Sequence, residues 1–593
     1  MHGEAEVSKG LPWFEYPLPL HSSRADKCKL TAEQCAYRAG HWRYWYVADW
    51  VYALGTIYFI LAIIALSLIG FWTLKLAPAS LRKKSWWQKI VGVFRFASYR
   101  RYDIKVLRYQ TPSIAVSVLL VIGALFFSAM TLGPKPILAT KTNMIALLTG
   151  VSHERLMVFH IWVGWAMFVL ALIHTFPFII YHIWKGDMEM EWKMSLVYWS
   201  GVACLIPQGY LTFMSLPWIR NYCYEFFKAT HFLAAVFFMV FFFIHCGGIL
   251  TSWDYFIAAG ALYSVSWLYS QTRTYLANGI SLRATLTPAS DHVLKITIPV
   301  GTMRWQPGQH VFLRFLTLGV HALTAHPFTI CSAPSEGDLG GKGNASRQSS
   351  STLVFYVQPR GGLTGRLAKL ASQRPGLSVP VLAEGPYGGI MSRPLHTYDQ
   401  SLVVACGAGA GFSIPFVISH IRNEIADLRA SKSDTDSPVD PARRLRVLIS
   451  TRDQRLPEWY DAALAEYLEE NSLPVTLNGV EILIHLTSAV ENGVGSSSQS
   501  CEQVEEKSPA DSVSHVAPER SSKLPFKLLS GRPDLSAVVR DATLQTGVSV
   551  GIAVCGPKQV LKAVQDEAAA AQLRILNSEA GSKEVYLHSE SFS

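Results

Sequence analysis

The chain has 593 residues, of which 50% are hydrophobic and 16% are charged, and its formal net charge is +10. This composition is too apolar for an ordinary soluble protein, yet the long apolar runs fall almost entirely within the first 275 residues. The positive charge gathers in one segment beside apolar spans, which argues against nucleic-acid binding. We therefore expect a membrane-embedded half followed by a globular half.

Residues 1–45 form a polar segment that we expect to be extracytoplasmic. It lacks the apolar core of a signal peptide, so the first span is expected to act as an uncleaved anchor. If Cys28 and Cys35 lie outside the cytosol they could form a disulfide, and two unpaired thiols are an equally good reading. Nine cysteines without a CxxC pair give no sign of an iron–sulfur or zinc site.

The expected membrane domain, residues 46–275, contains six stretches that approach the roughly 20 apolar residues needed to cross a bilayer. They lie near 48–74, 113–132, 156–183, 195–214, 224–246 and 254–271. Between Lys75 and Arg108 the first connecting loop holds ten Lys or Arg residues and one Asp. The positive-inside rule places such a loop in the cytosol.

Four histidines recur at a fixed spacing within two of these spans: His160 and His174, then His231 and His245. Fourteen residues make almost four helical turns, so each pair lies near one helix face and about 21 Å apart along the axis. Histidine is costly inside a membrane, and imidazole is a common axial ligand of haem iron.

Two b-type haems stacked across the bilayer would use all four histidines. If the two helices run in the same direction, His160 pairs with His231 and His174 pairs with His245. Two protein ligands per iron leave no open position, which favours electron relay over oxygen binding. His153 and His182 lie at span ends outside this spacing, and we interpret them as interfacial residues.

The order of the spans leaves a gap in the topology. If the C-terminal half is cytosolic, the acidic loop around Asp187, Glu189 and Glu191 falls outside. The chain should then cross the membrane twice between the basic loop and residue 156, but only 113–132 is a good span. Either the short stretch 137–151 re-enters the membrane, or the sequence lacks a helix near residues 133–141.

The globular half begins near residue 280 with a β-barrel pattern and continues as an α/β pattern. Alternating strands are predicted at Leu282–Leu286, Val293–Ile298, His310–Phe315 and Leu353–Gln358. Buried parallel strands are predicted at Ser401–Cys406, Leu445–Ser450 and Gly551–Cys555, with a helix from about Ile414. Segments 335–351, 429–443 and 488–523 are predicted to be disordered loops.

Short motifs in this half point to a flavin and a nicotinamide nucleotide. The glycines of Gly361-Gly362-Leu363-Thr364 let backbone amides approach a pyrophosphate. The turn from Gly407 to Gly411 follows a strand and opens a helix, as dinucleotide-phosphate turns do. In chain order the motifs are His326-Pro327-Phe328-Thr329, Gly361-Gly362-Leu363-Thr364, Glu384-Gly385-Pro386-Tyr387-Gly388, Gly407-Ala408-Gly409-Ala410-Gly411 and Cys555-Gly556-Pro557.

From about residue 40 onward, the chain resembles fungal-type ferric and cupric-chelate reductases, a family within the superfamily that also contains the NADPH oxidases. The paired His-x13-His helices, the HPFT tetrapeptide and the CGP tripeptide, in this order, carry the resemblance. The family pattern has seven spans. This sequence departs from it between Pro136 and Thr140, where the family has an extracytoplasmic loop and another helix.

The resemblance implies a fold class, a multi-span α-helical membrane haem domain followed by a ferredoxin–NADP reductase-like module. That module comprises an antiparallel FAD-binding β-barrel at 279–395 and an α/β NADPH-binding domain at 398–593, with a disordered insertion at about 488–523.

The resemblance also assigns roles to individual residues. Those from His326 to Thr329 contact the flavin, and those from Gly361 to Thr364 face its pyrophosphate. Arg452 matches the position that recognises the 2′-phosphate, although a plain surface charge is the competing reading. Phe592 matches a terminal aromatic beside the flavin, with a frayed tail as the alternative, and it joins Cys555 as a catalytic candidate. The NADPH-binding residues are Gly407, Gly409, Gly411, Cys555, Gly556 and Pro557.

The implied activity is electron transfer from cytosolic NADPH through FAD and two haems to an extracytoplasmic ferric or cupric chelate, in support of iron uptake. The lipid bilayer is the expected environment, most simply the plasma membrane with the vacuolar membrane as an alternative. A permease or oxidase partner for iron stays open. An NADPH oxidase producing superoxide shares every motif, and a catalytically inactive membrane cytochrome is a third possibility. The extra first span and the basic loop after it favour the reductase.

Overall fold

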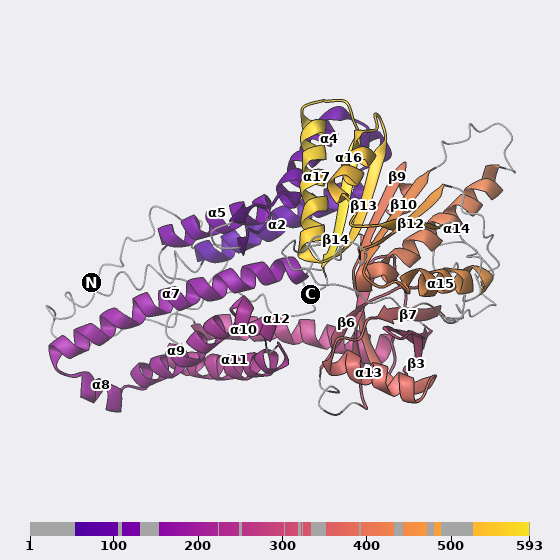
Figure 1. Ribbon diagram of the computed structural model, residues 1–593. Helices are drawn as coiled ribbons and strands as arrows, with labels where there is room; N and C mark the ends of the chain where they lie inside the picture. The colour runs from indigo at the N-terminus through magenta and orange to yellow at the C-terminus, as the bar shows by residue number, and fades with distance from the viewer. Residues whose placement is uncertain are drawn as a thin grey trace, which may run out of the picture. The chain divides into compact units, whose positions relative to one another are not determined.

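The computed structural model describes residues 54–104, 109–130, 153–247, 252–333, 351–390, 393–431, 443–470, 479–487 and 526–591, apart from a few isolated positions (Figure 1). The chain divides into two compact units, residues 1–76 with 116–270 and residues 77–115 with 271–593. Cys28, Cys35, the departure between Pro136 and Thr140, and most of the three predicted loops lie outside the described residues.

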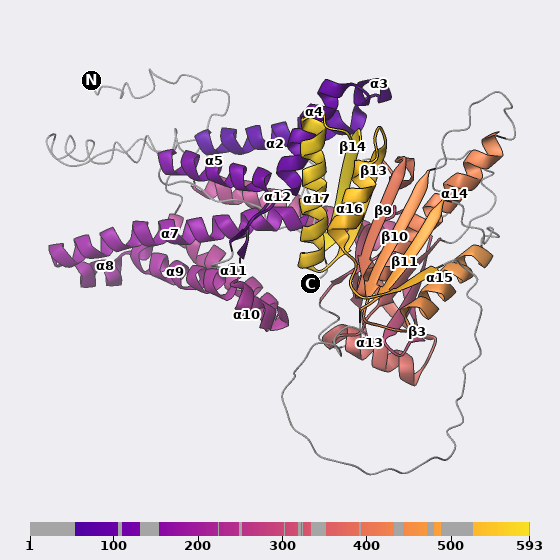
Figure 2. The same cartoon turned by 45° about the horizontal axis from the view of Figure 1, so that its top comes forward.

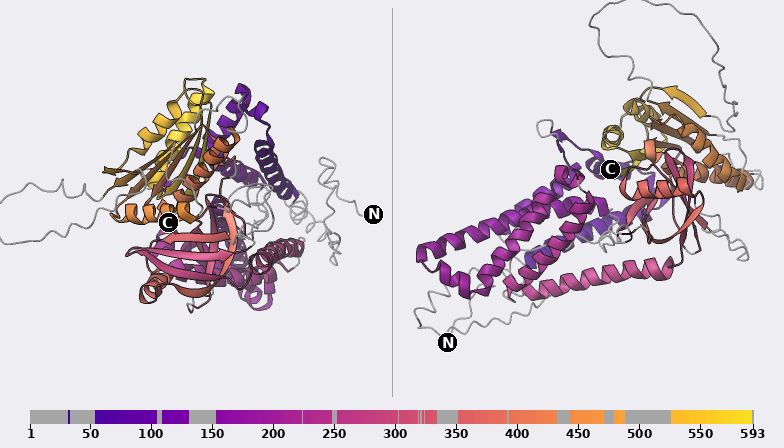
Figure 3. Two further views of the ribbon diagram at one scale, coloured as in Figure 1. Left: turned by 90° about the vertical axis from the view of Figure 1, so that its right-hand side faces the viewer. Right: turned by 60° about the horizontal axis from the view of Figure 1, so that its bottom comes forward.

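Each predicted span contains a helix. These are α2 Leu54–Leu76, α5 Ile114–Met130, α7 His153–Lys185, α9 Leu196–Met214, α11 Tyr224–Cys246 and α12 Ser252–Thr272, with the short α8 Met188–Met194 and α10 Pro217–Tyr222 between them (Figure 3, right). Within the described residues, three segments are long and apolar enough to cross a membrane: Tyr58–Leu76, Met157–Phe176 and Phe226–Cys246. The apolar stretch Ile114–Gly123 is shorter.

Helix α9 packs against α11 through a stripe of small and polar side chains. Ser200, Cys204, Gln208 and Thr212 recur at every fourth position and are all buried. The Cys204 thiol donates to the carbonyl oxygen of Phe238 on α11 at 3.9 Å. Small side chains at this spacing allow membrane helices to approach closely, because no bulky group separates their backbones.

The predicted barrel is a six-stranded antiparallel sheet in the order β6-β5-β8-β3-β4-β7 (Figure 3, left). Alternate residues of β4 are fully buried (Leu294, Ile296 and Ile298), so its period-two pattern does face a core. Helix α13 Gly362–Gln373 covers this core. The strands are β3 Arg283–Ser290, β4 Val293–Val300, β5 Gln309–Phe315, β6 His326–Thr329, β7 Ser351–Val357 and β8 Leu377–Gly388.

The last part of the chain is a parallel sheet in the order β12-β11-β10-β9-β13-β14, with helices on both faces (Figure 2). The chain moves outward from β9 to one side and returns to its other side at β13, which makes a topological switch point there. The strands are β9 Gln400–Cys406, β10 Arg444–Thr451, β11 Val480–Leu486, β12 Phe526–Ser530, β13 Ser549–Gly556 and β14 Glu584–Ser591. The helices are α14 Ile414–Ser431, α15 Leu456–Glu470, α16 Leu535–Leu544 and α17 Lys558–Leu576.

The basic loop after the first span is largely helical and packs on the nucleotide-binding sheet. It contains α3 Ala79–Arg82, α4 Ser85–Tyr99 and a small hairpin, β1 Asp103–Ile104 with β2 Tyr109–Gln110. Helix α4 lies along α17 (Figure 2). The Leu587 N–H of edge strand β14 donates to the buried Tyr99 hydroxyl at 3.0 Å, and Arg95 donates to the Val585 carbonyl at 2.9 Å. The loop therefore covers backbone groups that an edge strand would otherwise leave unpaired.

Candidate electron-transfer site

The structure brings the four spaced histidines together in two pairs across α7 and α11. The ring centres of His160 and His231 are 6.4 Å apart, and those of His174 and His245 are also 6.4 Å apart. These are the pairs expected for two helices that run in the same direction. The ring planes cross at 69° and 79°, so in neither pair do the rings stack face to face.

This spacing suits a metal ion between the rings of each pair. A metal–imidazole bond of about 2 Å on each side, plus roughly 1.2 Å from each nitrogen to its ring centre, gives a separation of about 6.4 Å. Both observed separations match that value. The donors are imidazole nitrogens, which are the commonest axial ligands of haem iron. The residues present therefore fit two bis-histidine haems.

The surroundings of His245 fix its orientation. Its Nδ1 lies 2.8 Å from the carbonyl oxygen of Val197 at the start of α9, and such a hydrogen bond holds the imidazole in one orientation. Gly201, one turn further along α9, leaves room for the ring. A Cβ atom there would lie 2.7 Å from the Cε1 and 2.9 Å from the Nδ1 of His245. A glycine is therefore needed at this position if the imidazole is to stay where it is.

The flavin motif occupies β6, beside β5, with His310 opposite Thr329 in the register. Phe328 points into the barrel core and Pro327 is exposed, as alternation along a strand requires. The Nε2 of His326 is hydrogen-bonded to the Thr324 hydroxyl at 3.0 Å. The motif thus has a buried anchor and polar groups at the barrel surface, where a flavin could contact them.

The motif from Gly361 to Thr364 forms the first turn of α13. Gly361 and Gly362 have φ angles of 133° and 52°, and no atom lies within 4 Å of where a Cβ would stand. Both glycines are exposed, so a pyrophosphate could approach the backbone at this helix N-terminus. Leu363 is buried in the barrel core and anchors the turn, and the Thr364 hydroxyl donates to the Gly361 carbonyl at 3.1 Å.

The dinucleotide motifs gather at the carboxyl edge of the parallel sheet. Strand β9 leads into a 3₁₀ turn, Gly407–Ser413, which precedes α14, and Gly407 has a φ angle of 50°. Cys555 is the last residue but one of the neighbouring strand β13, where the register places it beside Ala405. Arg452 follows β10 and is exposed. Nucleotides bind α/β sheets at this edge, beside the switch point. Gly409 and Gly556 are buried, whereas Pro557 is exposed just before α17.

Gly411 lies where the dinucleotide turn meets the barrel. A Cβ there would lie only 2.7 Å from the Sγ of Cys331 and 3.4 Å from the Cβ of Tyr356. Burial raises the pKa of the Cys331 thiol to about 12, and it raises the pKa of Cys406 to about 11. Both thiols therefore stay protonated and weakly nucleophilic at neutral pH. Cys555 is also buried, and the other predicted catalytic residue, Phe592, lies outside the described residues.

A half-buried cluster at the same junction was not predicted from the sequence. The Nε2 of His588 lies 3.1 Å from the Oε1 of Glu590, and both side chains belong to β14. A Cβ on Gly388 would lie 3.1 Å from the Nδ1 of His310 and 3.4 Å from that same Glu590 oxygen, so His310 of β5 faces the pair. The period-two spacing of His588 and Glu590, just before Phe592, was the only available sign in the sequence.

Burial and the neighbouring charges act in opposite directions on the pKa values of His310 and Glu590. Burial lowers the pKa of His310, and the Glu590 carboxylate only partly offsets that effect. Burial would raise the pKa of Glu590, but the hydrogen bond and charge of His588, the charge of His310 and the Gly389 N–H together hold it below its usual value. Glu590 is therefore ionised at neutral pH, and its nearest cationic neighbours are the His588 and His310 rings.

Comparison with known proteins supports the same organisation. The model of the ferric reductase-like transmembrane component matches residues 114–242, that of an FAD-binding domain matches 278–390, and that of the ferric reductase NAD-binding domain matches 398–569. The chain is thus similar to ferric reductases in its transmembrane, flavin and nucleotide parts. The predicted fold class is thereby confirmed, because these models cover the helical membrane part and both parts of the reductase module.

Proteins similar to this chain include a probable cell surface ferric reductase of Aspergillus oryzae, 30% identical over 57% of this chain and 46% of that protein. A ferric/cupric reductase transmembrane component of Saccharomyces cerevisiae is 24% identical over 73% of this chain and 56% of its own length. The chain thus spans about half the length of these relatives. A ferredoxin NADP+ reductase of Neisseria gonorrhoeae is similar over 52% of this chain and 97% of its own, with 12% identity and a TM-score of 0.31.

Proposed function

We propose that this protein is an NADPH-dependent ferric- or cupric-chelate reductase that moves electrons across a membrane. The observation that carries the proposal is the pair of 6.4 Å histidine–histidine separations, which suit two haem irons, in one chain with a flavin-type barrel and a dinucleotide-type sheet. The electron path would run from cytosolic NADPH through FAD and two b-type haems to an extracytoplasmic chelate, supporting iron uptake.

Each cofactor has residues that could hold it. When bound, NADPH would supply a hydride, FAD would divide its electron pair, and the haems would carry single electrons. Gly361 and Gly362 are exposed, so the FAD pyrophosphate could approach their backbone, and the turn from Gly407 to Gly411 is placed for the nicotinamide nucleotide. Arg452 would pair with the 2′-phosphate of NADPH.

The order of helices supports a direction for the path. The start of α12 lies beside the end of α11, where the rings of Phe243 and Trp253 stack at 5.1 Å. Helix α12 has 21 residues, so it is about 31 Å long and can return across the bilayer. The barrel that follows would then lie on the side of His231. We infer that electrons reach the His160 and His231 site first and leave from the His174 and His245 site.

The same reasoning proposes the membrane arrangement. The protein is integral to a membrane, and we propose the plasma membrane, with the domains at 279–395 and 398–593 in the cytosol. The basic loop that carries α4 would lie on the same side, as the positive-inside rule requires.

Spectroscopy and turnover of the full-length protein test this proposal. The purified protein should show low-spin haem at two haems per FAD and should reduce Fe(III)–citrate with NADPH. The variant His231→Ala should lose that reduction, and retained activity in it would refute the model. Superoxide formation in place of Fe(II) formation would identify an oxidase. Full haem loading without any NADPH turnover would identify an inactive cytochrome.

A further inference from the structure

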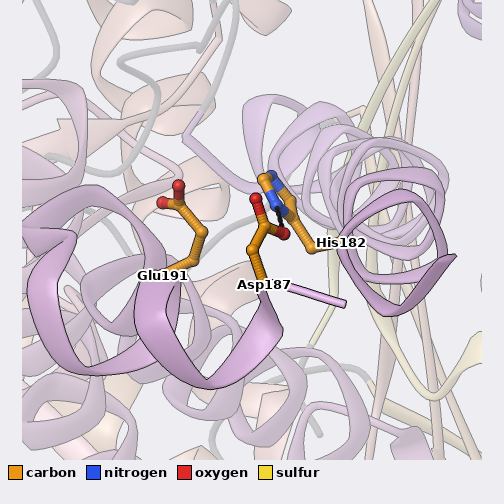
Figure 4. A group of neighbouring side chains, drawn as sticks. All are labelled: His182, Asp187 and Glu191. Carbon is orange, nitrogen blue, oxygen red and sulfur yellow. Dashed lines mark hydrogen bonds and ion pairs between the residues drawn. The ribbon is translucent and has the colours of Figure 1, made fainter. Parts of the chain in front are cut away.

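Three potential metal ligands meet where α7 ends and α8 begins. His182 lies near the end of α7, Asp187 lies between the helices and Glu191 lies on α8 (Figure 4). One ligand atom from each residue lies within 4.8 Å of the others, and all three residues are half-buried. The Nδ1 of His182 and the Oδ1 of Asp187 are 2.7 Å apart. The sequence pattern had marked His182 only as an interfacial residue.

Two side chains offer oxygen atoms to a cation here, one within the cluster and one beside it. Within the described part of the chain, the Glu191 carboxylate makes no hydrogen bond or ion pair, and the buried hydroxyl of Tyr198 has no hydrogen-bond partner. The Tyr198 ring stands edge-on to the His182 ring, with centres 5.4 Å apart. An imidazole, two carboxylates and a nearby phenol form a nitrogen and oxygen donor set that suits Fe(III) or Cu(II).

The cluster adjoins the histidine pair from which electrons are proposed to leave. His182 follows His174 by eight residues on α7, which is about 12 Å along the helix axis. The first turn of α9 touches both places, because the Val197 carbonyl bonds His245 while the adjacent Tyr198 faces His182. A metal ion at the cluster would thus lie beyond the pair of His174 and His245, on the side away from the pair of His160 and His231.

We propose that His182, Asp187 and Glu191 bind the metal ion of the substrate chelate while it accepts its electron. This inference rests on the proposed reductase function. His174 and His245 would hold the haem that supplies one electron, which would convert bound Fe(III) to Fe(II) without transfer of an atom or a proton. The carboxylates attract Fe(II) less strongly than Fe(III) because its charge is smaller, so reduction favours release.

Reoxidation of the haems by different acceptors tests the site. In stopped flow, the haems of the full-length protein are first reduced with NADPH and then mixed with Fe(III)–citrate or with ferricyanide. Glu191→Gln and Asp187→Asn should raise the half-saturating Fe(III)–citrate concentration about tenfold and leave the ferricyanide reaction unchanged. The matched control is Glu189→Gln on the same short helix, where the native carboxylate is exposed and pairs with Lys193 at 2.5 Å. It should behave as wild type with both acceptors.

Direct binding gives a second measurement that does not depend on turnover. Added Cu(II) alone should give an electron paramagnetic resonance signal with nitrogen coupling in the oxidised protein, and His182→Gln should remove that coupling. If the wild-type haems are not reoxidised by any metal chelate, the proposed function fails. If they are, but Glu191→Gln matches wild type, the metal site is wrong and the His182–Asp187 pair merely closes the α7 turn. Should Asp187→Asn lose haem through misfolding, Glu191→Gln alone decides.

Discussion

Substitution of Gly201 by alanine gives the most direct test of the haem geometry. The added Cβ would lie 2.7 Å from the His245 Cε1 atom, whereas carbon atoms in contact prefer about 3.5 Å, so the ring or the helix must move by roughly 0.8 Å. Helix α9 is held against α11 by its buried stripe, including Cys204 and Gln208. The imidazole is therefore expected to move, and a metal–nitrogen bond of about 2 Å tolerates only about 0.2 Å.

The expected result is the loss of one haem. The pyridine haemochromogen assay should give about one haem per FAD in Gly201→Ala in place of two, because the site of His160 and His231 is untouched. NADPH-driven reduction of Fe(III)–citrate should fall with it. Gly260→Ala on α12 is the matched control, since this helix carries none of the four histidines and nothing lies within 4 Å of its Cβ position. Two haems per FAD with unchanged reduction in Gly201→Ala would refute the ligand assignment of His245.

Two further predictions concern the soluble part. Tyr99→Phe leaves the buried N–H of Leu587 without its acceptor, which should lower the free energy of unfolding by about 1–3 kcal/mol in urea titrations followed by flavin fluorescence. The pKa values of His310 and Glu590 are both lower in the folded protein than their ordinary values of 6.5 and 4.5. The unfolded chain therefore binds more protons, so the flavin-release temperature should fall as the pH drops below about 6.5.

The Tyr99→Phe prediction and the pH prediction each have a control variant in the same chain. Tyr102→Phe removes the same hydroxyl from an exposed ring and should change the urea midpoint little, so equal effects at both tyrosines would contradict the role of the Leu587 contact. His310→Gln should flatten the fall in flavin-release temperature between about pH 6.5 and 5. An unchanged slope in that variant would place the titrating group elsewhere.

Periodic features of this chain were predictable because their physical cause is local. Each strand predicted in the barrel and in the parallel sheet overlaps one in the structure, and a helix begins at Ile414 as expected. The interval of 14 residues within each histidine pair followed from helix geometry alone, and parallel helices then fixed which rings meet. Alternation and helical spacing express burial on one face, which a single segment records by itself.

Features made by distant segments were not predictable in this way. The junction of His310 with Glu590 joins residues far apart in the chain, and neither lies in a recognisable motif. The contact of Gly411 with Cys331 depends on how two domains pack. The cluster of His182 with Asp187 and Glu191 arises because the chain turns sharply after α7, and hydropathy does not report the direction of that turn.

The basic loop shows how one segment can satisfy two requirements at different times. Its ten cationic residues predict a cytosolic loop, yet in the folded protein Arg95 pairs with Glu584 and Arg100 pairs with Asp566. These carboxylates belong to the last strand and last helix, which are synthesised long after the loop. During insertion the loop therefore carries its full positive charge and can set the topology. Once the nucleotide-binding domain has folded, the same arginines help α4 to cover the edge of β14.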